Sequence, residues 1–360
     1  MMRLTFVGDI ACDRPLLRAT KKQNYDFSNV FCVEDVFEMS DLVIGNLETC
    51  FGGGPRYGYK PFHYNVPDSF CTAIRNAGIG IVSTANNHCM DEGISGLKRT
   101  LRVLDKENIL HTGTFCENSP RYLVTEIKGK KIAFFSITYS VNKVYEASCC
   151  EDLSKYINII GFESRKFSRN SVFRCIQTNI KPELGKIRRK LAGKKIISAY
   201  KDKLTEQSIN KEWLDNIDKE IIKAKNDADI LIILLHIGGQ FNEEPGSFSE
   251  FMINHFYTIG VDAIIGHHPH TVQKIKKLGN TIIAYSLGGF CLSPSADYIV
   301  QDCLPEYSIA LHIDIDEETL KLEASTEIVK CIEDDDHMVH VVKAEIDSEE
   351  SKKIIKRISF

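Results

Sequence analysis

The stretch AIIGHHPHTV, Ala263 to Val272, places three histidines around a proline directly after a short apolar run. A short apolar run that meets polar residues at once is typical of a buried strand that ends in a loop. His268 and His270 have a spacing at which two imidazoles in a fixed turn can face neighbouring metal ions, and Pro269 restricts the backbone between them. The stretch therefore predicts a strand that delivers metal ligands at its carboxyl end.

The same succession of amphipathic helix, apolar strand and polar loop recurs along the chain. Apolar residues at helical spacing predict helices over residues 67–78, 92–107, 212–228 and 247–260, with Asp68 as the expected cap of the first. Short apolar runs predict buried strands over residues 4–7, 41–45, 79–84, 130–138, 229–235, 261–266 and 280–290, the last ending in glycines that allow close approach to a ligand or another strand. This alternation predicts an α/β fold.

Five of the predicted strands run straight into polar loops, with the sequences VGDIACD, GNLET, TANNHCMDEG, HIGGQ and GHHPH. Each loop alone is also typical of an ordinary turn or of a hydrogen-bonded core histidine. Ligands of α/β sheets, however, bind outside the carboxyl ends of the strands, so the joint occurrence of the loops favours a site. Their nitrogen and oxygen donors suit Mn, Zn or Fe, and the candidate ligands are Asp9, Glu48, Asn87, His236, His268 and His270.

The whole chain, residues 1–360, is expected to form a single domain. Residues 140–205 are the least regular part and are interpreted as a variable basic insertion, in which residues 181–203 form either a solvated helix face or a surface for an anionic polymer or partner. From residue 306 to 345, apolar and polar residues alternate, which predicts antiparallel strands that complete a second sheet.

Bulk composition narrows the choice of partners and compartment. A net charge of -4 and a pI near 6.3 give no overall attraction to nucleic acid, so no nucleic-acid partner is expected. No run approaches the roughly 18 apolar residues of a membrane span, and the N-terminus lacks the apolar core of a signal peptide. The 12 cysteines include no C-x-x-C pair, which favours reduced thiols. A cytoplasmic protein without a membrane span is therefore expected, unless a partner holds it at a membrane.

In this order, the motifs VGDI, DLVIGNLET, STANNHCMDEG, LLHIGGQF, GVDAIIGHHPHTVQ and IAYSLGGF resemble the CapA family of poly-γ-glutamate capsule synthesis proteins. That family is itself similar to the calcineurin-like metallophosphoesterases. The resemblance implies a metallophosphoesterase-like two-sheet β-sandwich flanked by helices, in four layers α/β/β/α. It also implies a centre of one or two divalent metal ions.

The resemblance assigns roles to positions of this chain. It makes Asp9 a bridging ligand, Glu48 the second acidic ligand and Asn87 the carboxamide ligand, with His236, His268 and His270 as the imidazole ligands. His88 corresponds to a histidine that binds no metal and assists the leaving group, and Asp91 is placed to orient it. Asn46 and His267 are left to contact the substrate or to support the ligands.

Two positions depart from the metallophosphoesterase pattern. Ala11 stands where that pattern has a histidine, so one ion loses a nitrogen ligand, and Glu48 stands where it has an aspartate. One ion or two therefore remain alternatives. Asp13 and Asp91 are the candidates to fill the vacancy.

Three functions are compatible with these residues. The first is a metal-dependent hydrolase, most simply a phosphoesterase, related to capsule or poly-γ-glutamate biosynthesis. The second is a non-catalytic assembly factor that binds γ-polyglutamate or synthase subunits, which the basic insertion favours. The third is a relic of the fold with a structural metal. The expected partners are an anionic small molecule or polymer, either a phosphate ester or γ-polyglutamate, and capsule-synthesis proteins.

Overall fold

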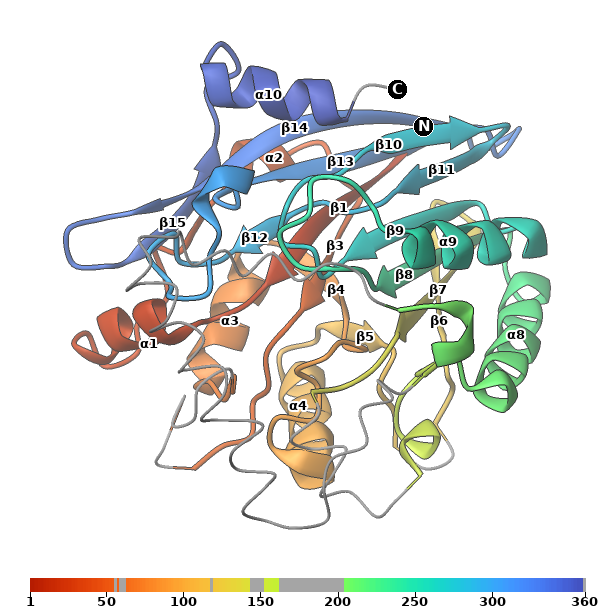
Figure 1. Cartoon of the computed structure of the whole chain (residues 1–360), viewed down its shortest axis with the longest axis horizontal. Coiled ribbons are helices and arrows are strands. Elements are labelled where there is room, and N and C mark those ends of the chain that lie inside the picture. Colours follow the sequence, from red (N-terminus) through yellow and green to blue (C-terminus); the bar gives the residue numbers. More distant parts are fainter. Residues whose placement is uncertain (55–56, 58–62, 117–118, 143–151, 162–203, 359–360) are drawn as a thin grey trace.

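The computed structural model describes residues 1–54, 57, 63–116, 119–142, 152–161 and 204–358. Two β-sheets pack face to face, and helices cover their outer faces (Figure 1). This confirms the predicted α/β sandwich of two sheets flanked by helices. The basic stretch over residues 181–203, with most of the insertion predicted over 140–205, lies outside the described residues.

The first sheet joins strands from the beginning of the chain to strands from its end. Its order is β2 (Phe31–Cys32), β15 (Val339–Lys343), β14 (Leu322–Glu333), β13 (Tyr307–Ile315), β1 (Met2–Ile10), β3 (Leu42–Leu47), β4 (Ile79–Ser83) and β5 (Leu110–Thr112), while β12 (Gly289–Cys291) also pairs with β1. β1, β3, β4 and β5 run parallel, whereas β13, β14 and β15 are antiparallel neighbours. Because β13 pairs with β1, the C-terminal strands complete the sheet that holds β1.

The second sheet has the order β10 (Ile275–Leu278), β11 (Thr281–Ala284), β9 (Ala263–His267), β8 (Ile230–His236), β7 (Lys130–Thr138) and β6 (Leu123–Ile127). β11, β9, β8 and β7 run parallel. Every residue of β8 is buried, because one face meets the other sheet and the opposite face meets helices. Burial on both faces explains why its sequence ILIILLH is continuously apolar rather than alternating.

Three apolar clusters separate four layers. Between the sheets, Phe6 and Leu311 of the first sheet pack in one cluster with Phe134 and Ile232 of the second. The outer face of the second sheet is covered by α8 (Lys211–Asn226) and α9 (Ser247–Ile259), which lie beside β7 and β8 in Figure 1. The outer face of the first sheet is covered by α1 (Arg14–Lys21), α2 (Glu34–Phe37), α3 (Asp68–Asn76) and α4 (Gly93–Lys106).

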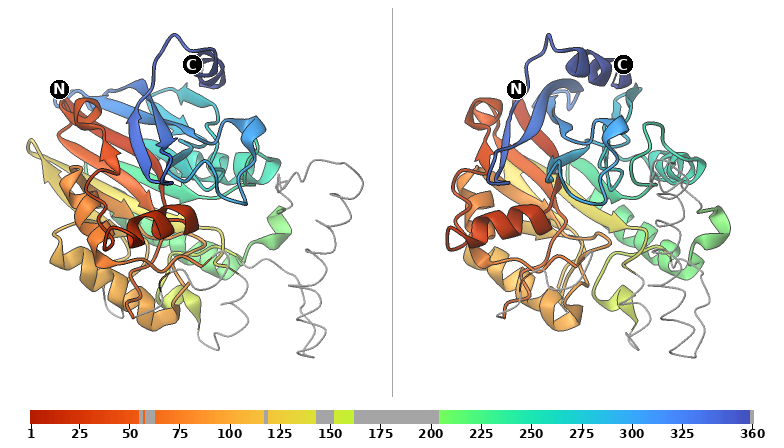
Figure 2. Two further views of the ribbon diagram at one scale, coloured as in Figure 1. Left: turned by 90° about the vertical axis from the view of Figure 1, so that its left-hand side faces the viewer. Right: turned by 60° about the vertical axis from the view of Figure 1, so that its left-hand side comes forward.

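Outside these layers lie a C-terminal helix and short 3₁₀ turns. α10 (Glu349–Arg357) sits at the top of both views in Figure 2, and its Ile354 joins the core between the sheets. The 3₁₀ turns span Leu153–Lys155, Glu206–Ser208 and Gln301–Cys303. Among the described residues, no helix is both long and apolar enough to span a bilayer.

The structure corrects the strand predicted over residues 280–290. That segment forms β11 in the second sheet and β12 in the first, and the chain crosses between the sheets at Gly288, where φ is 86°. The close approach expected of these glycines does occur, because a Cβ atom added at Gly8 would lie 1.9 Å from the Gly288 carbonyl oxygen. The chain must cross here because residues 281–284 pair with β9, whereas residues 289–291 pair with β1.

The predicted cap of α3 is also corrected. Pro67 occupies the N-cap position, and Asp68 is the first helical residue. The Asp68 carboxylate instead accepts two hydrogen bonds from the Arg99 guanidinium of α4, at 2.8 and 2.9 Å. A charged partner on the neighbouring helix therefore takes the carboxylate that the sequence pattern assigned to a cap.

Candidate metal centre

The six candidate ligands converge where carboxyl ends of parallel strands from both sheets meet. Asp9 lies near the end of β1, Glu48 directly follows β3, and His236 ends β8. His268 and His270 follow β9, and Asn87 lies in the loop after β4. Two groups of side chains, Glu48–His236–His268 and Asp9–Glu48–His270, each offer ligand atoms within 4.8 Å of one another. Glu48 belongs to both groups.

Glu48 is the residue whose surroundings are hardest to explain without a cation. It is 0% exposed, and neither carboxylate oxygen has a hydrogen-bond partner among the described residues. Its Oε1 lies 3.7 Å from Nε2 of His236 and 3.8 Å from Nε2 of His270. Burial raises the pKa of Glu48 well above its usual range, and the carboxylates of Asp9 and Asp91 raise it further. A buried carboxylate without a donor is costly, so this geometry fits a group that binds cations.

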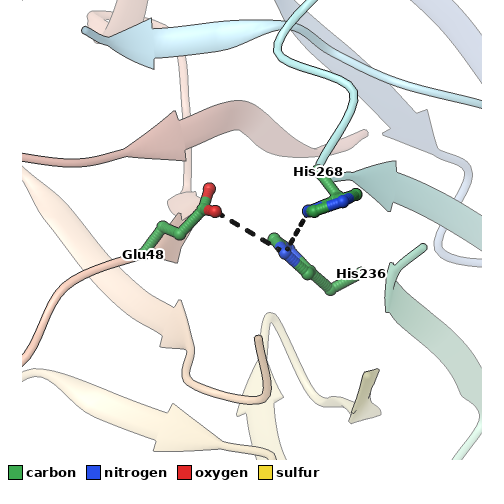
Figure 3. Close-up of side chains that lie close together, drawn as sticks. All are labelled: Glu48, His236 and His268. Atoms are coloured by element: carbon green, nitrogen blue, oxygen red, sulfur yellow. Dashed lines mark hydrogen bonds and ion pairs between the residues drawn. The ribbon is translucent and has the colours of Figure 1, made fainter. Parts of the chain in front are cut away.

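His236 is surrounded by candidate ligands of the same ion. Its Nε2 lies 2.8 Å from Oδ1 of Asn87 and 3.0 Å from Nδ1 of His268. Figure 3 shows Glu48 and His268 directed at this ring from two sides. Nε2 of His236 carries at most one hydrogen, so it cannot form hydrogen bonds with Asn87, His268 and Glu48 at the same time. A metal ion, in contrast, binds several ligands at once.

Asp9 anchors the other group. Its Oδ2 lies 2.9 Å from Nδ1 of His270, and its Oδ1 accepts a hydrogen bond of 2.7 Å from Nδ2 of Asn46. Asn46 also lies 3.2 Å from Nδ1 of His236, so it links ligands from the two groups. His267 approaches Asp9 at 3.6 Å and belongs to neither group. Asn46 and His267 therefore lie against the candidate ligands.

Burial disfavours the charged form of three of these histidines, His236, His267 and His268. Burial lowers the pKa of His236 well below its usual range and that of His268 to about 3. Burial likewise lowers the pKa of His267 to about 4. Burial also opposes ionisation of Asp9, but the hydrogen bond from His270 and the nearby imidazoles hold its pKa below the usual range. Neutral imidazoles and an ionised carboxylate are the forms that bind metal.

The histidine turn holds an uncommon backbone conformation. His268 and His270 both have positive φ, 96° and 54°, on either side of Pro269. Residues other than glycine in such regions cost about 1–3 kcal/mol each and persist where the surroundings impose them, often at functional sites. The turn therefore places both imidazoles toward the centre at an energetic cost.

His88 lies beside the two groups with its own carboxylate partner. Its Nδ1 is 2.7 Å from Oδ2 of Asp91, which also accepts a hydrogen bond of 2.6 Å from the backbone N–H of Tyr64. The ring of Tyr64 stacks on His88 with centroids 4.2 Å apart. The structure thus brings together the predicted pair His88 and Asp91 and holds the imidazole in one orientation.

Asp13 and Asp91, the acids considered for the vacancy at Ala11, belong to neither group of candidate ligands. Asp13 accepts hydrogen bonds from the backbone and side chain of Ser293 and from the hydroxyl of Tyr298. Asp91 is bound to His88 and Tyr64, as described above. Other donors hold both carboxylates, and a role for either acid at this vacancy stays a prediction.

The sequence did not single out three residues that border the centre. Tyr64 stacks on His88, Asn142 accepts a hydrogen bond of 3.4 Å from Nδ2 of Asn87, and Gln240 lies 3.4 Å from Nε2 of His270. Gln240 ends the polar loop HIGGQ, so its position after β8 was a usable signal. Tyr64 and Asn142 follow no regular pattern, and only the folded chain brings them to the site.

Comparisons with known proteins relate the chain to one family. Residues 3–293 match the family model described as "Bacterial capsule synthesis protein PGA_cap". The chain is similar to PGA biosynthesis protein CapA of Bacillus subtilis, with 26% identity over 293 residues, which cover 81% of this chain and 63% of that protein. Capsule biosynthesis protein CapA of Bacillus anthracis is 24% identical over 313 residues, 86% of this chain and 64% of that protein. Uncharacterized protein y4sH of Sinorhizobium fredii is 24% identical over 343 residues, 88% and 72% of the two chains.

Proposed function

The chain belongs to the bacterial capsule synthesis protein PGA_cap family, and from this premise we propose that it is a metal-dependent hydrolase, most simply a phosphoesterase, serving capsule or poly-γ-glutamate biosynthesis. The observation that carries the proposal is Glu48, whose unpartnered oxygens lie between the two groups of candidate ligands. One ion would be held by Glu48, Asn87, His236 and His268, and a second by Asp9, Glu48 and His270. The nitrogen and oxygen donors suit Mn, Zn or Fe.

The reaction needs an electrophilic centre and a proton donor. Divalent ions bound there would supply Lewis acidity and lower the pKa of water, which suits in-line displacement at a phosphate ester. His88 donates a proton to the leaving oxygen through Nε2, because its Nδ1 is held by Asp91 at 2.7 Å. The Asp91 carboxylate stabilises the charged imidazole before it gives up that proton. A donor of this kind contributes typically about 10²- to 10⁴-fold to rate.

The substrate of this hydrolase is an anionic small molecule or polymer, a phosphate ester in the simplest case. The free thiols of the described cysteines support a reducing compartment, so we place the activity in the cytoplasm. Purified protein loaded with Mn²⁺ and assayed on mono- and diester phosphates tests the proposal. Turnover lost in His270→Ala and reduced in His88→Ala supports it. Absence of turnover with Mn²⁺, Zn²⁺ or Fe²⁺ contradicts it.

A second candidate function is a non-catalytic role in assembly, in which the chain binds γ-polyglutamate or capsule-synthesis proteins. The names of the two Bacillus relatives, which refer to PGA and capsule biosynthesis, favour it. Binding of polyglutamate at low salt, lost when the charges of Arg188, Arg189 and Lys190 are reversed, supports this role. Turnover without polyglutamate binding favours the hydrolase instead.

A further inference from the structure

The two groups of candidate ligands are unequal. Beside Glu48, His236 and His268, the oxygen of Asn87 supplies a fourth donor at 2.8 Å from the His236 nitrogen. The group of Asp9, Glu48 and His270 receives no fourth ligand atom from Ala11, because the side chain of Ala11 is a methyl group. Three protein donors hold an ion less tightly than four, so a further donor at this group would alter the affinity.

Gln240 lies at the incomplete group. Its Nε2 is 3.4 Å from Nε2 of His270. The next residue fixes the loop against the histidine turn, because the backbone N–H of Phe241 donates a hydrogen bond of 2.7 Å to the carbonyl of Pro269. The ring of Phe241 also lies against His270, with centroids 5.8 Å apart. The backbone and ring of Phe241 therefore hold the loop that carries this carboxamide against the histidine turn.

The two ring nitrogens of His270 face different neighbours. Its Nδ1 lies 2.9 Å from Oδ2 of Asp9. Its Nε2 has Oε1 of Glu48 at 3.8 Å and Nε2 of Gln240 at 3.4 Å as neighbours. A rotation of the Gln240 side-chain amide exchanges its nitrogen for its oxygen Oε1 at this position, so the carboxamide can present an oxygen to a cation between these groups.

We propose that Gln240 is a protein ligand of the ion held by Asp9, Glu48 and His270, in place of the nitrogen ligand that is absent at Ala11. The inference rests on the metal centre proposed above and assigns it a further residue. A neutral amide oxygen suits Mn²⁺ but binds more weakly than an imidazole or a carboxylate. The Gln240 ion is therefore the more weakly held of the two.

Binding of Mn²⁺ to the full chain tests this assignment without an activity assay. Free and bound Mn²⁺ are measured by electron paramagnetic resonance for wild type, Gln240→Met, Gln240→Glu and the exposed control Gln301→Met. Gln240→Met keeps the length of the side chain but removes its oxygen, and we expect it to weaken one of the two ions about 10- to 100-fold while leaving the other unchanged. Gln240→Glu adds a carboxylate and is expected to tighten the same ion.

The possible failures are distinguishable. If wild type holds two ions and both Gln240 variants match Gln301→Met, the assignment of Gln240 is overturned while the metal centre stands. If wild type holds no Mn²⁺, the centre itself is overturned, and the assignment falls with it. Circular dichroism of each variant establishes that it is folded, and the near-isosteric Gln240→Glu keeps the test decisive if Gln240→Met does not fold.

Discussion

Replacing Glu48 by glutamine tests the carboxylate on which the proposed centre depends. Glu48 is 0% exposed, and its oxygens have no hydrogen-bond partner among the described residues. A buried polar group without a partner costs about 1–3 kcal/mol, and more when it is charged. Glutamine has nearly the same shape but no charge, so it is not repelled by Asp9. We expect Glu48→Gln to stabilise the metal-free protein by about 1–3 kcal/mol near pH 8.

The same substitution has a pH dependence of defined sign. Burial, followed by Asp9 and Asp91, raises the pKa of Glu48 in the folded state above the ordinary value of 4.5. The folded state then binds this proton more tightly than the unfolded state does. The stability that this proton contributes is present below about pH 4.5 and is lost as the pH rises. The advantage of Glu48→Gln should therefore be small at pH 5 and larger at pH 8.

Added metal should make wild type more stable than Glu48→Gln, the reverse of the order expected without metal. A ligand at 100 times its dissociation constant stabilises a folded protein by about 2.7 kcal/mol, and wild type should gain this from Mn²⁺. Glu48→Gln lacks the carboxylate shared by both groups and should gain much less. Thermal unfolding with and without Mn²⁺ measures both effects, with exposed Glu318→Gln as the matched control. The reasoning is refuted if Glu48→Gln is destabilised without metal and gains as much as wild type with Mn²⁺.

Three further predictions concern catalysis, packing and pH. His88→Asn should keep Mn²⁺ content at the wild-type level and lower phosphate-ester turnover by about 10²- to 10⁴-fold. Asp91→Asn should lower turnover by a smaller factor. Loss of metal binding in His88→Asn would contradict the proton-donor role. Phe134 lies between the sheets, and Phe134→Ala should lower the free energy of unfolding by about 3–5 kcal/mol in urea titrations. Ile222 is 51% exposed, and Ile222→Ala should change that free energy by less than about 0.5 kcal/mol. Similar losses in the two variants would contradict the assigned core. Burial lowers the pKa of His312 below 6.5, so the free energy of unfolding should fall as the pH drops below that value. If His312→Gln shows the same pH dependence of the free energy of unfolding as wild type, His312 is not the cause of this fall.

Much of the fold was predictable because each element has a local cause. The run KKIAFFSIT predicted β7 with its observed bounds, since a strand buried on both faces needs apolar residues at nearly every position. The segment over residues 280–290 was mispredicted because its division between two sheets depends on partners far away in the sequence, β9 and β1. The helical cap at Asp68 failed for a similar reason, since Arg99 binds its carboxylate.

The candidate site was predictable to the extent that its residues follow strands. Asp9, Glu48 and His236 stand at strand ends, and the structure brings them together as that position implies. Gln240 and Tyr64 reach the centre through loop contacts, with the histidine turn and with His88 respectively, which no periodic pattern encodes. That these residues bind metal and act on a substrate stays a prediction.

Anomalous diffraction from crystals soaked in Mn²⁺ tests the central claim most directly. We predict two peaks on either side of Glu48, one bounded by His236 and His268 and the other by Asp9 and His270. Peaks absent from both positions in Mn²⁺-soaked crystals, or found only on the protein surface, would contradict a metal centre built on Glu48.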